Sequence, residues 1–148
     1  MEQRRTNGLE YLQEVAAGRV PPAPIWRLMK IRLVEVERGR AVFEITPDEF
    51  HYNPLGMVHG GVAATILDSA MGCSLHTCLE PDDRYTTIEI KVNYLKAMTT
   101  ATGPVRGIGT ILHLGRTTAL SEGRLVGADG ALYAHATSTL LIKRGEAR

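Results

Sequence analysis

Cysteine is scarce in this sequence. The chain has two cysteines, Cys73 and Cys78, and no C-x-x-C pair. Five residues on a helix correspond to about 500° of rotation, so the two side chains point in different directions and we expect no disulfide between them. Two reduced thiols are typical of a cytosolic protein, and the expected location is therefore the cytoplasm.

Aromatic residues and excess charge are also scarce. Aromatic residues make up 5% of the chain and the formal net charge is +1, a composition that offers neither a base-stacking surface nor a basic patch for nucleic acid. The most apolar stretch, residues 60–79, contains Asp68 and His76, which argues against a membrane span. The N-terminus lacks the apolar core of a signal peptide. We therefore expect no nucleic-acid partner and no membrane association.

Several common site motifs are missing. The five histidines form no H-E-x-x-H pattern, so we expect no metal site. There is no G-x-S-x-G nucleophile elbow and no Walker A loop. Gly107-Ile-Gly109 lacks the third glycine of a dinucleotide-binding motif and opens no helix. We therefore expect no bound cofactor.

The length and composition predict one globular domain over residues 1–148. The chain is 44% hydrophobic and 22% charged, close to average globular usage. Residues 6–18 have the spacing of a short amphipathic helix, and the prolines that follow it cannot continue a helix. We assign residues 1–24 to this N-terminal helix and its proline-rich connector, and residues 25–142 to the core of the domain.

Hydrophobic periodicity predicts the elements of that core. Residues 60–79 are apolar nearly all round, as expected for a buried helix. In the strand over 85–95 polar side chains from Thr87 to Asn93 alternate with apolar ones from Ile88 to Tyr94, which predicts that the apolar set faces the core. The other strands are expected over 31–37, 40–46, 103–114, 116–127 and 131–142. The order predicts an α+β fold, a curved antiparallel sheet around one central helix, with the last four strands in a meander.

Two features of the helix over 60–79 suggest chemistry. Gly60 and Gly61 open it, and backbone N–H groups at a helix start can stabilise a developing oxyanion. Asp68 is a carboxylate in an otherwise apolar helix, where it needs a partner, a shifted pKa or a cavity. The structural alternatives are a tight turn at the two glycines and a hydrogen-bonded aspartate without a catalytic role.

The spacing of these two features leads to a prediction about assembly. Gly60 and Asp68 are eight residues apart, which is about 12 Å along a helix. A reacting carbonyl must lie about 3 Å from its oxyanion donors and similarly near the base. One helix cannot meet both demands, so a catalytic function requires a homodimer with two antiparallel helices and two shared sites.

The motif Asn53-x2-Gly56-x2-His59-Gly60-Gly61 with Asp68 resembles that of the hotdog-fold acyl-coenzyme A (CoA) thioesterases, in the PaaI-like subgroup associated with phenylacetic acid degradation. The resemblance covers residues 25–142. It implies a hotdog fold, a long helix held by a curved antiparallel sheet, assembled as a homodimer and often as a dimer of dimers. The implied activity is hydrolysis of an acyl-CoA ester, with CoA entering only as part of the substrate.

The resemblance also implies roles for individual residues. Asp68 would be the general base or nucleophile, and the Gly60 N–H would polarise the thioester carbonyl. Asn53 and His59 would orient substrate and water, and Thr87 would position the water. The substrate-binding candidates are Gly61 at the helix start and two cations at strand ends, Lys96 and Arg116. Taken alone, His59 suits a capping residue, Asn53 a turn former, and the two cations an ordinary solvated surface.

Two other functions are compatible with the same sequence. A non-catalytic protein could bind acyl thioesters in the same groove, and it would retain the ligand intact. A hotdog dehydratase or hydratase needs a different arrangement of histidine and acid, which this sequence does not show. The acyl group itself, aromatic or fatty, is left open.

Overall fold

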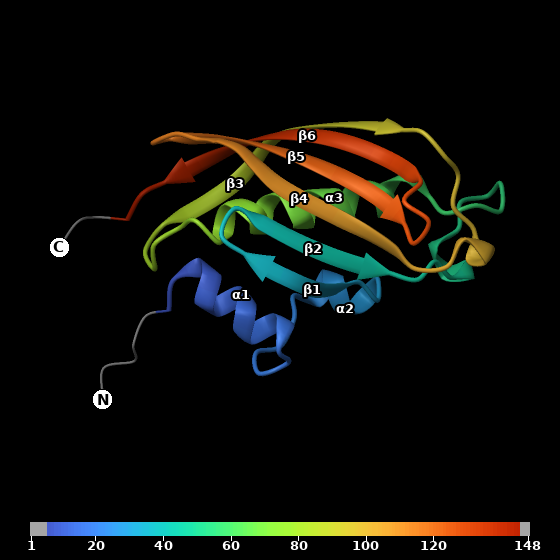
Figure 1. Ribbon diagram of the computed structural model, residues 1–148, viewed down its shortest axis with the longest axis horizontal. Helices are drawn as coiled ribbons and strands as arrows, with labels where there is room; N and C mark the ends of the chain where they lie inside the picture. The colour runs from blue at the N-terminus through green and yellow to red at the C-terminus, as the bar shows by residue number, and fades with distance from the viewer. Residues whose placement is uncertain (1–5, 146–148) are drawn as a thin grey trace.

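The computed structural model describes residues 6–145 and contains three α-helices and six strands in that range (Figure 1). The helices are α1 (Gly8–Ala16), α2 (Pro24–Leu28) and α3 (Gly60–His76). The strands are β1 (Arg32–Glu37), β2 (Arg40–Ile45), β3 (Arg84–Tyr94), β4 (Val105–Leu114), β5 (Thr118–Gly127) and β6 (Leu132–Lys143). Two 3₁₀ turns, η1 (Glu49–His51) and η2 (Thr100–Thr102), lie in the connecting loops. No helix within residues 6–145 has the length and hydrophobicity needed to cross a bilayer.

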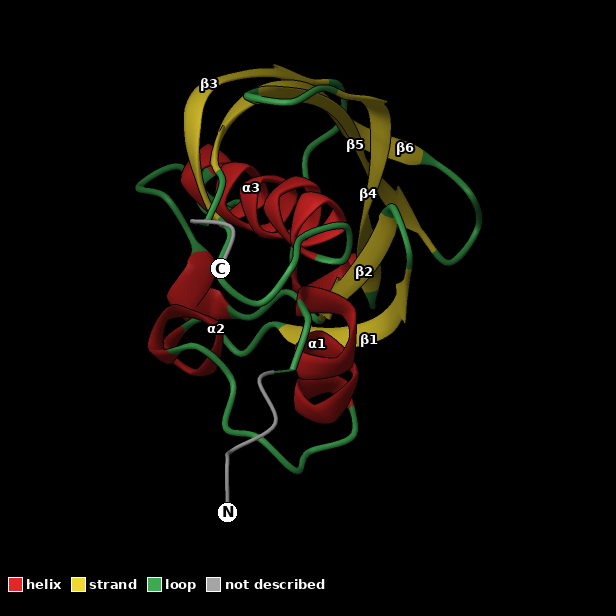
Figure 2. Cartoon of the chain, turned by 90° about the vertical axis from the view of Figure 1, so that its left-hand side faces the viewer, coloured by secondary structure: helices red, strands yellow, loops and turns green. Residues whose placement is uncertain are grey.

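All six strands form one antiparallel sheet in the order β1-β2-β4-β5-β6-β3. The sheet curves around α3, and α1 and α2 lie beside β1 (Figure 2). This arrangement confirms the predicted curved sheet around a central helix with an additional N-terminal helix. The predicted four-strand meander is wrong, because only β4, β5 and β6 follow one another in space. The connection through α3 carries the chain from β2 to the opposite edge, where β3 pairs with β6.

The predicted faces of β3 are also corrected by the structure. A β-bulge between Thr87 and Glu89 shifts the register against β6 and exchanges the two faces of the strand. Before the bulge the Thr87 hydroxyl reaches α3, and after it the Tyr94 hydroxyl does. The expectation that Ile88 packs in the core is wrong, since 55% of its surface is exposed. An edge strand with such an apolar side chain is available for pairing with another chain.

Two glycines in β4 let α3 lie close against the sheet. A Cβ atom at Gly109 would overlap the backbone carbonyl of Ala70, and one at Gly107 would overlap the side chain of Ile66. These positions explain the Gly-Ile-Gly motif as a packing feature. The residues that fill the space between helix and sheet are fully buried and include Phe43, Ile66, Leu67, Met71, Val105 and Leu125.

The N-terminal helices cover the side of α3 next to β1. Leu12 and Val15 of α1 are buried in the main core. Trp26 of α2 packs edge-on against Phe43, with ring centroids 4.8 Å apart. The indole N–H of Trp26 donates to the hydroxyl of Ser69 at 3.1 Å, so α2 contacts α3 one residue beyond Asp68.

Candidate active site

The start of α3 has one backbone donor without an acceptor. His59 is the N-cap residue, and its Nδ1 accepts from the Gly61 N–H at 2.8 Å. The His59 carbonyl accepts from the Val62 N–H at 2.9 Å. For the Gly60 N–H, residues 6–145 provide no acceptor. The positive end of the helix dipole therefore presents one free N–H group, the arrangement that stabilises a negatively charged oxygen.

Asn53 organises the loop that leads into α3. Its Oδ1 accepts from the backbone N–H groups of Leu55 at 2.9 Å and Met57 at 3.3 Å. Asn53 therefore stabilises the turn and His59 caps α3, the structural roles that each residue type suits when taken alone. Each side chain keeps one nitrogen, Nδ2 of Asn53 and Nε2 of His59, without a hydrogen bond to any residue in the described range. These nitrogens are available to a ligand.

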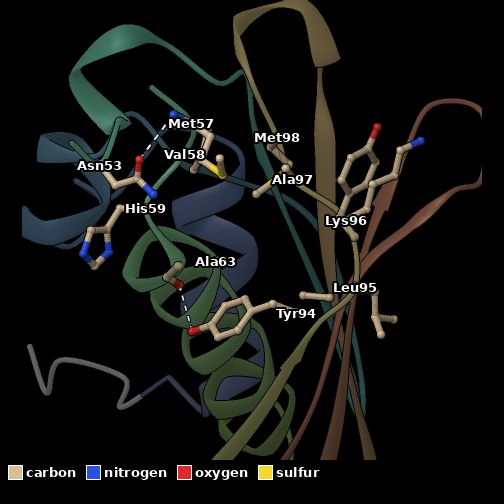
Figure 3. Close-up of a pocket in the computed structure, with 13 residues that line it drawn as sticks. Asn53, Met57, Val58, His59, Ala63, Tyr94, Leu95, Lys96, Ala97 and Met98 are labelled. Carbon is tan, nitrogen blue, oxygen red and sulfur yellow. Dashed lines mark hydrogen bonds between the residues drawn. The ribbon is translucent and has the colours of Figure 1, made fainter. Parts of the chain in front are cut away.

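A cavity of about 330 Å³ lies beside this helix start and brings together Asn53, His59, Gly60 and Lys96. Figure 3 shows the segments that line it, the loop around Asn53 and the chain that leaves β3 at Tyr94. The Tyr94 hydroxyl donates to the Gly60 carbonyl at 3.1 Å. The Lys96 ammonium group lies 5.2 Å from the centroid of the Tyr133 ring. We will call this space the polar cavity after Asn53, His59 and Lys96, although apolar side chains such as Met57, Val58 and Met98 form most of its wall.

Sequence reasoning missed Tyr94 as a residue of this site. A Cβ atom at Gly60 would lie 3.1–3.3 Å from atoms of the Tyr94 ring and hydroxyl, so this contact favours glycine at position 60. The strand pattern gave no signal, because it assigned Tyr94 to the core face with the other apolar residues. The side chain is in fact 58% exposed and lines the polar cavity.

Asp68 lies further along α3, exposed and outside the polar cavity. The Thr87 hydroxyl of β3 donates to its Oδ1 at 2.8 Å, so the structure brings these two predicted residues together. Along the helix axis Asp68 is about 12 Å from Gly60. Within one chain the carboxylate and the free N–H therefore cannot act on one carbonyl group.

The groups around Asp68 are held in their neutral forms. Burial, with a smaller contribution from the Asp68 charge, raises the pKa of the Cys73 thiol to about 12. Burial also raises the pKa of the Tyr85 hydroxyl, and Cys73 and Asp68 add to this effect. A thiol with this pKa contributes almost no thiolate at neutral pH, which argues against Cys73 as the nucleophile.

The remaining candidates lie apart from the polar cavity. Gly61 lines a second cavity that also includes His59, and its N–H is already bonded to the His59 ring. Arg116 is exposed in the turn between β4 and β5, and its carbonyl accepts from the Arg144 guanidinium at 3.1 Å. Across residues 6–145 no group of three histidine, cysteine or acidic side chains is arranged to hold a metal ion.

Comparisons with known proteins agree with this geometry. The family model described as the thioesterase superfamily matches residues 55–134. This match covers more than half of the chain and includes α3 with Gly60 and Asp68. The chain belongs to the thioesterase superfamily.

Individual members of the superfamily match over most of the chain. A 1,4-dihydroxy-2-naphthoyl-CoA hydrolase of Listeria monocytogenes is 27% identical over 114 residues, which cover 77% of this chain and 91% of that protein. A protein of Saccharolobus solfataricus, described by its name as a candidate esterase, is 32% identical over 120 residues, covering 81% and 84% of the two chains. The predicted class of enzyme, a thioester hydrolase, is confirmed at the level of the family.

The fold is shared with a solved structure from the predicted group. The PaaI protein of the E. coli phenylacetic acid degradation operon superimposes with a TM-score of 0.80, at 14% identity, over 93% of this chain and 96% of that one. At this identity the likeness concerns the fold, and it confirms the hotdog architecture of this thioesterase-family chain.

Proposed function

We propose that the chain hydrolyses acyl-CoA thioesters to the free acid and CoA. The observation that supports this proposal is a pair of groups on one helix, the Gly60 N–H, for which residues 6–145 provide no acceptor, and the exposed Asp68 carboxylate, which accepts from Thr87. The first suits a carbonyl oxygen that gains negative charge, and the second suits a base or nucleophile. A thioester has a good leaving group, so one carboxylate and one oxyanion donor suffice without a serine triad.

The proposed site is shared between two copies of the chain. Two antiparallel α3 helices would place the Gly60 N–H of one chain beside Asp68 of the other. The exposed edge of the sheet supports such pairing, because β3 carries exposed Ile88, Ile90 and Tyr94 and has a neighbour on one side alone. A second β3 would continue the sheet and cover these side chains. A dimer of dimers is compatible with the same pairing.

The chemistry can follow two routes, which differ in whether Asp68 takes a proton from the attacking water or itself attacks the carbonyl carbon. As a general base, Asp68 takes a proton from water while the water oxygen bonds to the carbonyl carbon. The C–S bond then breaks, and the proton passes to the departing thiolate. As a nucleophile, Asp68 bonds to the carbonyl carbon and releases the thiolate, and water then hydrolyses the resulting anhydride. In both routes Thr87 orients the carboxylate or the water.

The CoA portion of the substrate would approach through the polar cavity. Lys96 supplies a cation there. In the proposed antiparallel dimer, the β4–β5 turn of the partner, which carries Arg116, would lie toward the same cavity. Free amide and imidazole nitrogens of Asn53 and His59 would orient the thioester and assist the leaving sulfur. Relatives named as a CoA hydrolase and as an esterase support this class of reaction. Two free thiols fit a reducing cytoplasm as its location.

The test is release of free thiol from a panel of acyl-CoA esters by the wild type and by Asp68→Asn. We expect turnover to fall by about 10²–10⁴-fold in the variant, the usual contribution of a general base. Asp129→Asn, at an exposed turn, is the matched control and should retain activity. Saturable binding without thiol release by the wild type would identify a non-catalytic acyl-CoA-binding protein instead. A fully active monomer in analytical ultracentrifugation would refute the shared site.

A further inference from the structure

A second cavity, of about 470 Å³, shares His59 with the polar cavity. His59 lines both spaces, Gly60 lines the first, and Gly61 lines the second. A group bound at the start of α3 therefore lies next to both spaces. We will call the second space the apolar cavity, because Leu28, Met29, Phe50 and Val62 form much of its wall.

The polar side chains in the wall of the apolar cavity are already satisfied within the chain. His51 is buried, with Nδ1 accepting from the Asp48 N–H at 3.0 Å and Nε2 bonded to the Met29 carbonyl at 3.0 Å. The Tyr52 hydroxyl bonds to Thr100, and the Thr65 hydroxyl donates to the Gly61 carbonyl at 2.8 Å.

Apart from these groups, His59 is the polar side chain of the wall, and it lines the polar cavity as well. No charged side chain lines the apolar cavity within residues 6–145. A ligand would therefore find mainly apolar contacts, together with polar side chains that already have partners within the chain.

We infer that the apolar cavity holds the acyl group of the substrate, and that Leu28 of α2 sets which acyl groups are accepted. This inference rests on the proposed function. The thioester carbon would lie at the start of α3, with its sulfur and the pantetheine arm toward Lys96 and its acyl group toward Leu28. The accepted acyl groups are apolar, because no charged side chain lines the cavity within residues 6–145 and the Lys30 ammonium group, 4.6 Å from the centroid of the Phe50 ring, is engaged with that ring.

The volume indicates how large an acyl group the cavity can hold. At about 30 Å³ for each non-hydrogen atom, the cavity has room for roughly 15 atoms, which includes a benzoyl or a decanoyl group. Leu28 and Phe50 are 75% and 51% exposed, an unusual exposure for two large apolar side chains that line one cavity. A bound acyl group would cover both side chains. Leu28 of α2 and Met29, its C-cap residue, would then contribute directly to substrate selection.

The experiment compares acetyl-CoA with hexanoyl-, benzoyl- and decanoyl-CoA for wild type, Leu28→Asp and Ile25→Asp. Ile25 is the matched control, since it is a 45% exposed apolar residue of α2 that does not line the cavity. We expect Leu28→Asp to lower kcat/KM for decanoyl-CoA and benzoyl-CoA by about tenfold or more, equal to about two lost methylene contacts. Its kcat/KM for acetyl-CoA should stay within about twofold, because that group does not reach Leu28. Leu28→Trp should penalise decanoyl-CoA more than hexanoyl-CoA.

The outcomes separate this inference from the proposed function. Equal losses for acetyl-CoA and decanoyl-CoA in Leu28→Asp, or no loss for either, would overturn the assignment of the acyl group to this cavity. If the wild type hydrolyses none of the esters, the dissociation constant of decanoyl-CoA becomes the readout. Binding weakened by Leu28→Asp and unchanged by Ile25→Asp would then support the cavity while refuting hydrolysis. Binding unchanged in both variants would refute the cavity as well.

Discussion

Proline at position 60 would remove the proposed oxyanion donor and leave the helix intact. Gly60 is the first residue of α3, where proline is well tolerated because the N–H of that position has no partner within the helix. The preceding residue, His59, has φ −62° and ψ 136°, within the extended region that a residue before proline adopts. Gly60→Pro therefore deletes the N–H group for which residues 6–145 provide no acceptor.

The expected loss follows from the value of one oxyanion donor. Removing such a donor lowers kcat by about 10²–10³-fold, which corresponds to about 2.7–4 kcal/mol. Gly60→Ala is the matched control, because it keeps the N–H while adding the Cβ that meets the Tyr94 ring at 3.1–3.2 Å. The difference in kcat between the two variants isolates the hydrogen-bond donor from the crowding. Thermal unfolding of both variants checks that α3 is retained.

Mixed dimers then test which chain supplies each group. Gly60→Pro and Asp68→Asn chains with different affinity tags can be co-expressed and the heterodimer purified through both tags. One site of this heterodimer combines an intact Gly60 with an intact Asp68 from the other chain, so about half of wild-type activity should return. Both parent homodimers should stay nearly inactive. Activity equal in Gly60→Pro and Gly60→Ala, or no recovery in the heterodimer, would refute the shared oxyanion site.

Three further predictions concern single positions. Thr87→Val should lower kcat about tenfold or more by removing a hydrogen bond to a charged group, while Thr87→Ser retains activity in the thiol-release assay. Gly109→Ala should destabilise the fold in urea unfolding by about 3 kcal/mol, since its Cβ would overlap the backbone of Ala70. Burial, and secondarily the charge of Arg84, lowers the pKa of His76, so the unfolded chain binds more protons in mild acid. Stability should therefore fall as the pH drops below about 6.5, and the urea midpoint of His76→Gln should fall less over the same range. A constant midpoint in the wild type between pH 8 and pH 5.5 would contradict this.

The periodicity of apolar residues predicted the positions of the helices and strands well, because this periodicity arises when an element buries one face. The helix predicted over residues 60–79 is α3, which ends three residues earlier, at His76. The strand predicted over 85–95 is β3, displaced by one residue. Glycines 18 and 39, at the predicted end of α1 and in the β1–β2 turn, have positive φ values of 75° and 78°. In each case the signal lies within a few neighbouring residues.

Strand pairing and the β-bulge could not be predicted from local patterns, because both depend on residues far apart in the sequence. No local pattern shows that β3 pairs with β6, since the position of β3 is set by the path of α3 across the sheet. The bulge after Thr87 is equally invisible, although it decides which side chains face the helix. The same limit applies to Tyr94 and Trp26, whose contacts with Gly60 and Ser69 join segments 34 and 43 residues apart.

The bulge links the strand pattern to the proposed chemistry. Without it, an alternating strand that directs Thr87 toward Asp68 would direct residue 94 away from α3. With it, one strand supplies both the hydroxyl that holds the carboxylate and the phenol that contacts Gly60. Those two contacts lie at separate points along α3, so each chain organises two half-sites. Symmetric, antiparallel pairing of two such chains would complete both sites with one interface, and for this reason we expect changes in β3 that weaken dimerisation to abolish hydrolysis at both sites together.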